Sequence, residues 1–584
     1  MNIQATPTPA WEQETLIHAL LDPACYPYAV DRIVLIETHI SFVLLTGPYA
    51  YKIKKAVNLG FLDFTTPKLR HFFCEEELRL NRRLAPRLYL DVIPIGGMPQ
   101  KPKLGAESGA FEFAVKMRQF AQEGLLDRVL CRGTLTVEHV DAIAATVAAF
   151  HQRIESARPD QDYGGASGIE SAMRQNFVQI RSLLATPAER DSLALTEAWS
   201  LAQHATLLPV FAQRHEQRFI RECHGDLHLG NIALVDGEIQ VFDCIEFNPS
   251  LRWIDVINEI AFLVMDLDEH NRADFAWRFL NAYLQETGDY AGLRLLRYYQ
   301  IYRAMVRAKV ARIRASQSHL SVEDRKLALD TYAAYAGYAS KVTVPTRPGL
   351  VITHGLSGSG KTTVTQLLLQ ELGAVRVRSD IERKRLQHIA PQAKSDSGVD
   401  IGIYVASATQ ATYAELRRLA GLILDAGCVA IVDATFLRRW QRDSLRQLAA
   451  ERNVPFVIVS CLAEDEELRR RLLQREHAGR DASEATLEVL AHQLATQEPL
   501  QADERALAIV FDSEREPASE LRQRVSDALQ AKRRHDFFRC LQRRCRWHLC
   551  PAPTASGAAL RCRAGNRCQA RHCAVAAPDR RARR

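Results

Sequence analysis

The sequence of 584 residues has few of the features that membrane-spanning, secreted or strongly polyanion-binding proteins need. No apolar run approaches 18 residues, so we expect no membrane-spanning helix and no membrane partner. The first fifteen residues, MNIQATPTPAWEQET, contain neither a basic segment nor an apolar core. They predict no signal peptide, and the cytoplasm is the expected location. The net charge of +7 comes from the C-terminal segment, and the rest of the chain is nearly neutral, which argues against a polyanionic partner for the folded part.

The C-terminal segment, residues 531–584, lacks any sustained hydrophobic period and is rich in Arg, Cys, Ala and Pro, so we predict a disordered tail. Twelve arginines from His535 onward give nucleic acid weak support as a partner. The six tail cysteines are spaced C-x4-C and C-x5-C rather than C-x2-C, which argues against a structural zinc site there. The other seven cysteines occur singly, as is typical of free thiols in a reducing compartment.

Hydrophobic periodicity divides the remaining chain into two regions, so we predict a multidomain protein with α+β and α/β parts. Residues 1–340 begin strand-rich and continue mostly helical, with one strand-rich island around residues 232–247, which is the layout of a two-lobed kinase. Residues 341–348, KVTVPTRP, are the predicted linker. In residues 349–530 strands and helices alternate, which predicts a doubly wound parallel sheet.

The sharpest motif is GLSGSGKT, residues 355–362, which matches G-x-x-x-x-G-K-[ST] between a predicted strand and a predicted helix. Glycines let backbone N–H groups wrap a phosphate, and the helix N-terminus adds a favourable dipole. Lys361 would bridge the β- and γ-phosphates of ATP, and the Thr362 hydroxyl would hold Mg²⁺. The alternative is a glycine-rich turn before an ordinary helix. The predicted nucleotide-binding residues are Gly355, Ser357, Gly358, Ser359, Gly360, Lys361, Thr362 and Thr363.

Later polar residues follow the predicted strands of this region. Asp433 ends the strand VAIVD, where a carboxylate can hold Mg²⁺ through water. Asp380 could take the proton of an attacking hydroxyl and Arg383 could steady the acceptor, although an N-cap aspartate with a solvated arginine explains their positions equally well. Arg475 and Arg480 could close over the transferring phosphate, but a solvated charge run is the simpler interpretation.

Residues 349–515 resemble the small P-loop kinases grouped with polynucleotide kinase, gluconate kinase and zeta toxins, within the AAA-type P-loop proteins. The shared features are the P-loop, a later S-D-x-x-R, the strand end V-D-A-T-F and an arginine-bearing segment before a helix. The resemblance implies that Asp380 is a general base and that Arg383 contacts the acceptor or a phosphate. It also implies that Arg475 and Arg480 belong to a lid.

HGDLHLGN, residues 224–231, followed by the strand end VFD at Asp243, is the second strong constellation. Phosphoryl transfer needs a carboxylate near the acceptor hydroxyl and oxygen ligands for the metal. Asp226 fits the first role, and Asn231 with Asp243 fits the second. His224 is expected to order the loop by hydrogen bonding. A polar turn before a hairpin is the alternative, but it explains neither the spacing nor the strand end.

This pattern resembles the aminoglycoside phosphotransferase and choline-kinase-like family over about residues 30–340. The resemblance implies that a lysine of AYKIKK contacts the nucleotide phosphates. We choose Lys52 over Lys54 for that contact, and Glu77 over Glu75 and Glu76 as its ion-pair partner. It also implies a hinge at residues 117–119 and a structural carboxylate at Asp255. The first hairpin lacks glycines and Cys244 follows the metal aspartate, which leaves phosphate coverage and acceptor open.

The tandem order resembles a group of bacterial bifunctional proteins known mainly as predicted ATP-binding proteins. We therefore predict a Mg²⁺- and ATP-dependent phosphotransferase whose acceptor is a small molecule or nucleotide-like hydroxyl compound. The alternatives are a P-loop ATPase switch or toxin-like regulator that controls the N-terminal kinase, and an N-terminal pseudokinase binding module. Arg303, Arg307 and Arg314 share one face of a predicted helix, which we interpret as a solvated face rather than a docking site for an acidic acceptor.

Overall fold

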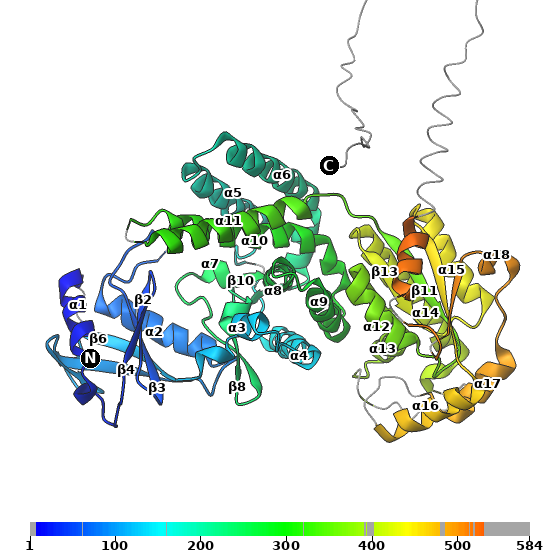
Figure 1. Ribbon diagram of the computed structural model, residues 1–584, viewed down its shortest axis with the longest axis horizontal. Helices are drawn as coiled ribbons and strands as arrows, with labels where there is room; N and C mark the ends of the chain where they lie inside the picture. Colours follow the sequence, from blue (N-terminus) through cyan, green and yellow to red (C-terminus); the bar gives the residue numbers. More distant parts are fainter. Residues whose placement is uncertain are drawn as a thin grey trace, which may run out of the picture. The chain divides into compact units, whose positions relative to one another are not determined.

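The computed structural model describes residues 7–60, 62–158, 160–318, 320–390, 393, 402–478, 485–512, 514–517 and 520–530 (Figure 1). The predicted tail, residues 531–584, and the predicted lid residue Arg480 lie outside these ranges. Within them, no helix has both the length and the apolar character that crossing a membrane requires.

An antiparallel six-stranded sheet in the order β1-β2-β3-β6-β4-β5 forms the first part of the chain. Helix α2 packs against β4 and β6 of this sheet. Thr66 caps α2 by accepting a hydrogen bond from Leu69 N, and Pro67 takes the first helical position, where no amide hydrogen is needed. The elements are α1 (Ala10–Ala19), β1 (Val34–Glu37), β2 (Ser41–Leu45), β3 (Tyr49–Lys54), α2 (Pro67–Asn81), β4 (Tyr89–Met98), β5 (Lys101–Leu104) and β6 (Glu112–Arg118).

Helices dominate the next two hundred residues, interrupted by two short strand pairs, β7 with β10 and β8 with β9. Helix α8 is almost entirely buried and contacts α9 and α10, so it forms the centre of this part. The elements are α3 (Leu126–Cys131), α4 (Val137–Arg153), α5 (Ala166–Ser182), α6 (Pro187–Glu216), β7 (Ile220–Glu222), β8 (Ile232–Val235), β9 (Glu238–Val241), α7 (Pro249–Arg252), β10 (Trp253–Asp255), α8 (Val256–Glu269), α9 (Ala273–Thr287), α10 (Leu293–Ala315) and α11 (Val322–Val342).

The last part contains a five-stranded sheet in the order β12-β13-β11-β14-β15, with every neighbouring pair parallel. Leu350 and Ile352 pack with residues of α14 and α15, whereas Val351 packs with residues of α12, so side chains on both faces of the sheet are buried. The elements are β11 (Gly349–His354), α12 (Lys361–Leu372), β12 (Ala374–Arg378), α13 (Ser379–Leu386), α14 (Ala406–Asp425), β13 (Val429–Asp433), α15 (Arg439–Glu451), β14 (Phe456–Leu462), α16 (Asp465–Ala478), α17 (Leu487–Thr496), α18 (Ala502–Arg505) and β15 (Ala508–Asp512).

Candidate active sites

The first candidate site is the loop between β7 and β8, which carries HGDLHLGN. Asn231 donates from Nδ2 to Asp226 Oδ2 over 2.9 Å and to the Asp226 carbonyl over 3.0 Å. Because the amide nitrogen of Asn231 is used in this way, its oxygen is the atom that remains for a cation. His224 lies with Nε2 2.8 Å from the Phe242 carbonyl, which ties the loop to the segment that leads to Asp243. His224 thus has the loop-ordering position expected from the sequence.

Buried residues of two helices hold this loop from the protein interior. Glu259, in the first turn of α8, accepts hydrogen bonds from the amides of His224 and Gly225 over 2.7 and 2.9 Å. Arg303 of α10 donates to the Gly225 carbonyl over 2.9 Å and is only 4% exposed. The prediction of a solvated face is therefore wrong for Arg303. Helical spacing alone could not show that this face packs against a loop almost eighty residues earlier.

An ion-pair cluster lies beside the predicted metal aspartate. Lys52 Nζ lies 2.8 Å from Glu77 Oε1 and 2.6 Å from Asp243 Oδ1. Lys54 Nζ lies 2.6 Å from the other Glu77 oxygen and also pairs with Glu246. The structure thus brings Lys52, Glu77 and Asp243 together, and it adds the Lys54–Glu246 pair, which the sequence analysis did not anticipate. Three carboxylates face two ammonium groups, so the hard oxygen ligands and the excess negative charge fit Mg²⁺.

Electrostatic interactions favour the ionised forms of Asp226 and Glu77 by lowering the pKa of each carboxyl group. Burial alone would raise the pKa of Asp226, but the charge and hydrogen bond of His228, together with the charge of Arg307, lower it overall. Burial likewise opposes ionisation of Glu77, yet Lys52 and Lys54 lower its pKa to about 2. Asp226 is therefore a hydrogen-bond acceptor with little affinity for a proton.

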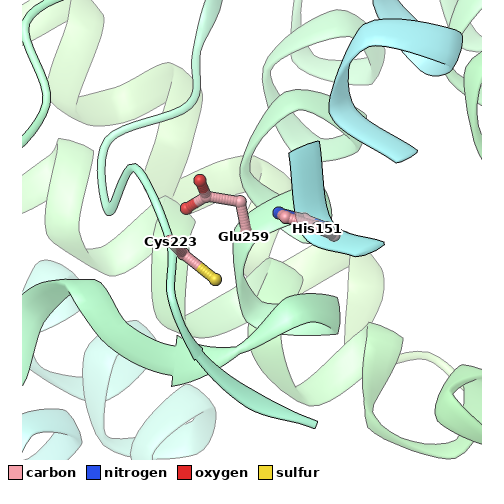
Figure 2. Close-up of side chains that lie close together, drawn as sticks. All are labelled: His151, Cys223 and Glu259. Atoms are coloured by element: carbon pink, nitrogen blue, oxygen red, sulfur yellow. The ribbon is translucent and has the colours of Figure 1, made fainter. Parts of the chain in front are cut away.

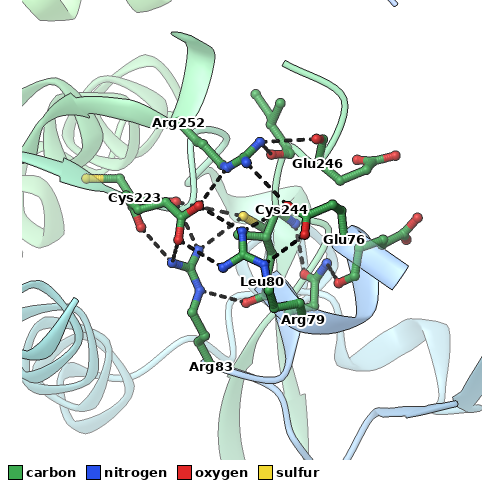
Figure 3. A network of polar contacts seen from close by, with 12 residues as sticks. Glu76, Arg79, Leu80, Arg83, Cys223, Cys244, Glu246 and Arg252 are labelled. Atoms are coloured by element: carbon green, nitrogen blue, oxygen red, sulfur yellow. Dashed lines mark hydrogen bonds and ion pairs between the residues drawn. The ribbon is translucent and has the colours of Figure 1, made fainter. Parts of the chain in front are cut away.

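A second network joins α2 to the start of the loop that carries HGDLHLGN (Figure 3). Arg79, Arg83 and Arg252 converge on the Glu222 carboxylate at the end of β7, at distances of 2.9 to 3.2 Å. Arg83 also donates to the Glu222 carbonyl over 2.8 Å. Glu77 lies on α2, so these contacts fix the helix that carries it relative to the loop that carries Asp226. Asp255, the predicted structural carboxylate, caps α8 and pairs with Arg214.

The second candidate site is the P-loop between β11 and α12. Gly355, Gly358 and Gly360 have φ values of 140°, 89° and 85°, which side chains with a Cβ rarely adopt. Lys361 Nζ donates to the Leu356 carbonyl over 2.6 Å, so the side chain folds back over the loop. Burial lowers the pKa of Lys361, and the more distant charge of Asp433 only partly compensates for it.

A cavity of about 150 Å³ adjoins this loop and collects most of the predicted residues. Arg383 donates to the Ile403 carbonyl over 2.9 Å and stacks over Tyr404, so it is not a solvated arginine. Asp433 accepts a hydrogen bond from Thr365 over 3.0 Å rather than from Thr362, the predicted metal-holding residue. The cavity is lined by Ser357, Gly358, Gly360, Lys361, Thr362, Asp380, Arg383, Asp433 and Arg475 among the predicted residues, with Arg378, Tyr404, Tyr413 and Gln493 in addition.

Gln493 of α17 is the clearest contact that the sequence analysis missed. It accepts from the Ser357 amide over 2.9 Å and donates to the Ser357 hydroxyl over 3.0 Å. A single glutamine on an amphipathic helix carries no sequence signal that would connect it to a loop over a hundred residues earlier. The structure thus adds an anchor between α17 and the P-loop.

Family models match both parts of the chain. Residues 74–296 match the Phosphotransferase enzyme family, and residues 350–500 match the AAA domain family. Uncharacterized proteins of Mycobacterium tuberculosis and Mycobacterium bovis are 31% identical over 455 residues, which is 78% of this chain and 89% of each relative. The chain belongs to the same family as these mycobacterial proteins. With its two kinase-type domains, this family member is an ATP-dependent phosphotransferase.

Solved structures also resemble individual parts of this family member. An amicoumacin kinase in complex with AMP-PNP, Ca²⁺ and Ami is 15% identical with a TM-score of 0.36, covering 56% of this chain and 93% of that one. The APS kinase of Mycobacterium tuberculosis, in complex with AMPPNP and APS, is 25% identical with a TM-score of 0.25, covering 32% of this chain and 99% of that one. TM-scores this low give no information about the acceptor.

Proposed function

We propose that both sites use Mg²⁺-bound ATP to phosphorylate hydroxyl groups, and that at least the first acceptor is a small molecule. A two-lobed kinase fold for residues 1–340 and a doubly wound P-loop fold for residues 349–530 belong to this proposal. The observation that carries it is the meeting of two groups of residues. Asp226 and Asn231 are hydrogen-bonded on one loop, and Lys52, Glu77 and Asp243 form ion pairs. The Phe242 amide, directly before Asp243, donates to the Asn231 carbonyl over 3.0 Å and so links the two groups. These residues come from segments up to 191 positions apart, so local sequence preference alone does not account for their meeting.

In the first site, Asp226 would accept a hydrogen bond from the acceptor hydroxyl and orient its oxygen toward the γ-phosphorus. The new oxygen–phosphorus bond forms as the bond to ADP breaks, and the hydroxyl proton passes to the Asp226 carboxylate. Because its pKa is lowered, Asp226 is suited to orienting the hydroxyl first and taking the proton late. Asn231 and Asp243 would hold Mg²⁺, which would neutralise phosphate charge, and Lys52 would contact the phosphates.

In the second site, the amides of the glycine loop and Lys361 would bind the ATP phosphates, with Thr362 and Asp433 placed for the metal. Asp380 would receive the proton of a second acceptor hydroxyl, while Arg383 and Arg475 would contact the acceptor or the transferring phosphate. These residues line one cavity, which supports a shared role. Oxygen ligands from a hydroxyl and a carboxylate suit Mg²⁺.

The test is a metabolite-panel assay for ATP-dependent phosphorylation. The wild-type chain is compared with Asp226→Ala, Lys361→Ala and the double variant, after circular dichroism shows that all are folded. We expect each single variant to lose a different subset of products and the double variant to lose all of them. If folded variants all retain wild-type turnover, neither site is catalytic.

A further inference from the structure

Three side chains that the proposed reaction does not use meet in the interior next to the first catalytic loop (Figure 2). His151 lies near the end of α4, Cys223 directly follows β7, and Glu259 lies in the first turn of α8. An imidazole nitrogen, the sulfur and a carboxylate oxygen lie within 4.8 Å of one another. The residues are 2%, 0% and 1% exposed, so bulk water does not reach them.

The imidazole of His151 has one ring nitrogen that is available to bind a ligand. Its Nδ1 lies 2.9 Å from the hydroxyl of Tyr283, whereas its buried Nε2 has no hydrogen-bond partner in the described part of the chain. A buried polar atom without a partner has lost its hydrogen bonds to water without compensation, which is unfavourable. When Nδ1–H donates to the tyrosine oxygen, Nε2 carries a free lone pair. Metal-binding histidines are usually oriented in this way, by donation from the other ring nitrogen to an oxygen.

We propose that His151, Cys223 and Glu259 form a buried Zn²⁺ site that fastens the first catalytic loop to helices α4 and α8. One thiolate, one imidazole and one carboxylate form a ligand set that zinc accepts, whereas Mg²⁺ and Ca²⁺ favour oxygen ligands alone. On binding, the Cys223 thiol releases its proton to solvent, and the thiolate and carboxylate together balance the two positive charges of the ion. A water molecule completes the fourth position.

The spacing of the three groups is close to what zinc needs. Ligand atoms around tetrahedral zinc lie roughly 3.5 Å apart, given bond lengths of about 2.0–2.3 Å. The present separations of up to 4.8 Å therefore require an inward movement of about 1 Å, which side-chain rotation can supply.

A metal ion at this position would act on the neighbouring loop that carries Asp226. Cys223 directly precedes the HGD sequence, and the two Glu259 oxygens already accept from the amides of His224 and Gly225. A metal bound to both residues would therefore restrain the backbone that positions Asp226. A trapped water molecule that bridges Nε2 to Glu259 is the competing explanation, and it predicts no dependence on Cys223.

The zinc content of the purified full-length chain tests the proposal. After loading with zinc and removal of unbound metal, mass spectrometry counts zinc per chain in the wild type, in Cys223→Ser and in the matched control Cys244→Ser. Cys244 is also buried and lies near the same loop, with Sγ 3.1 Å from the His224 carbonyl, but it is outside the cluster. We expect the wild type and the control to hold one more zinc ion per chain than Cys223→Ser. Tail cysteines contribute equally to all three proteins and cancel.

A site-resolved measurement on the wild-type chain covers the case in which Cys223→Ser fails to fold. Cysteine alkylation in mild urea, mapped by mass spectrometry, follows each thiol as the structure opens locally. We expect zinc to slow alkylation of Cys223 at least tenfold and to leave Cys244 unchanged. Equal zinc content in the folded variants, or no selective protection of Cys223, overturns the zinc site. Neither result depends on kinase activity, so the proposed function is tested separately.

Discussion

The two lysines that we propose to contact the ATP phosphates have opposite electrostatic surroundings. Burial disfavours the charged form of both lysines, but Lys52 has carboxylates of Glu77 and Asp243 within 2.8 Å, which raise its pKa overall. Lys361 instead donates to a carbonyl, and burial lowers its pKa. The charge of the first lysine is stabilised by the protein, whereas in our proposal the second would gain its counter-charge from the bound phosphate. The same residue type thus belongs to the folded framework in one site and to the ligand complex in the other.

The largest expected effect is on product formation, because we propose that each site depends on its own carboxylate, Asp226 or Asp380. Asp226→Asn keeps the size of the side chain but removes its charge, so we expect phosphorylation by the first site to fall about 1,000-fold, within the range for a general base. Products of the second site should persist in Asp226→Asn and disappear in Asp380→Asn. Quantitative mass spectrometry of both product sets checks this. Loss of all products in either folded variant would show that the two reactions are not independent.

The next largest effect is on the free energy of unfolding, when Lys52 or Lys361 is replaced by methionine. Lys52→Met leaves Asp243 and one Glu77 oxygen without a counter-charge, and we expect it to lower the free energy of unfolding by about 2–3 kcal/mol, somewhat below the range for a fully buried pair because Asp243 is half exposed. Lys361→Met removes a desolvated charge and should leave stability unchanged or slightly raised. Denaturant unfolding without nucleotide measures both. Equal destabilisation by the two substitutions would contradict the proposed electrostatic difference between the sites.

Burial also affects a histidine next to the P-loop, and it makes the free energy of unfolding depend on pH. Burial first, with Arg442 and Lys361, lowers the pKa of His354 to about 4. The unfolded chain therefore binds more protons than the folded chain between about pH 6.5 and 4, so stability falls as the pH is lowered through that window. We expect His354→Gln to remove roughly 2 kcal/mol of this loss, while His18→Gln, on an exposed side chain, should leave it intact. Parallel stability–pH curves for wild type and His354→Gln would contradict the assignment.

The parts of the sites that could be predicted best from the sequence are those in which one short segment supplies several groups at fixed spacing. Residues 355–362 and 224–231 are such segments, and the structure places their key residues in one cavity and one loop. Of the consecutive glutamates 75–77, only the packing of α2 against the sheet, at β4 and β6, decides which one meets Lys52. Glu75 instead lies near His71, and Glu76 pairs with Arg79.

The contacts that no local pattern could reveal are those made by supporting residues distant in sequence. Glu259 and Arg303 lie inside ordinary helical patterns, and their loop partners are 34 and 78 positions away. In both cases the deciding interactions form only when the chain has folded, so local periodicity does not encode them.

The smallest expected effect comes from Gln493, which binds the P-loop through Ser357 and has no counterpart in the ion-pair cluster of the first site. Gln493→Ala removes two hydrogen bonds to Ser357, each of which contributes about 1 kcal/mol. The contacts of Lys361 with the Leu356 carbonyl and of Arg471 with the Gly358 carbonyl remain in this variant, so we expect a limited effect. We expect the KM for ATP at the second site to rise about fivefold with kcat nearly unchanged, since the loop would be less ordered before binding. Gln497→Ala, at an exposed position after the same helix, is the control. First-site kinetics should not change in either variant, because Lys52 is positioned by the carboxylates of Glu77 and Asp243 and not by Gln493. An unchanged KM in Gln493→Ala would show that Gln493 does not prepare the loop for the nucleotide, and a lower KM would mean that Gln493 competes with the nucleotide for the Ser357 amide.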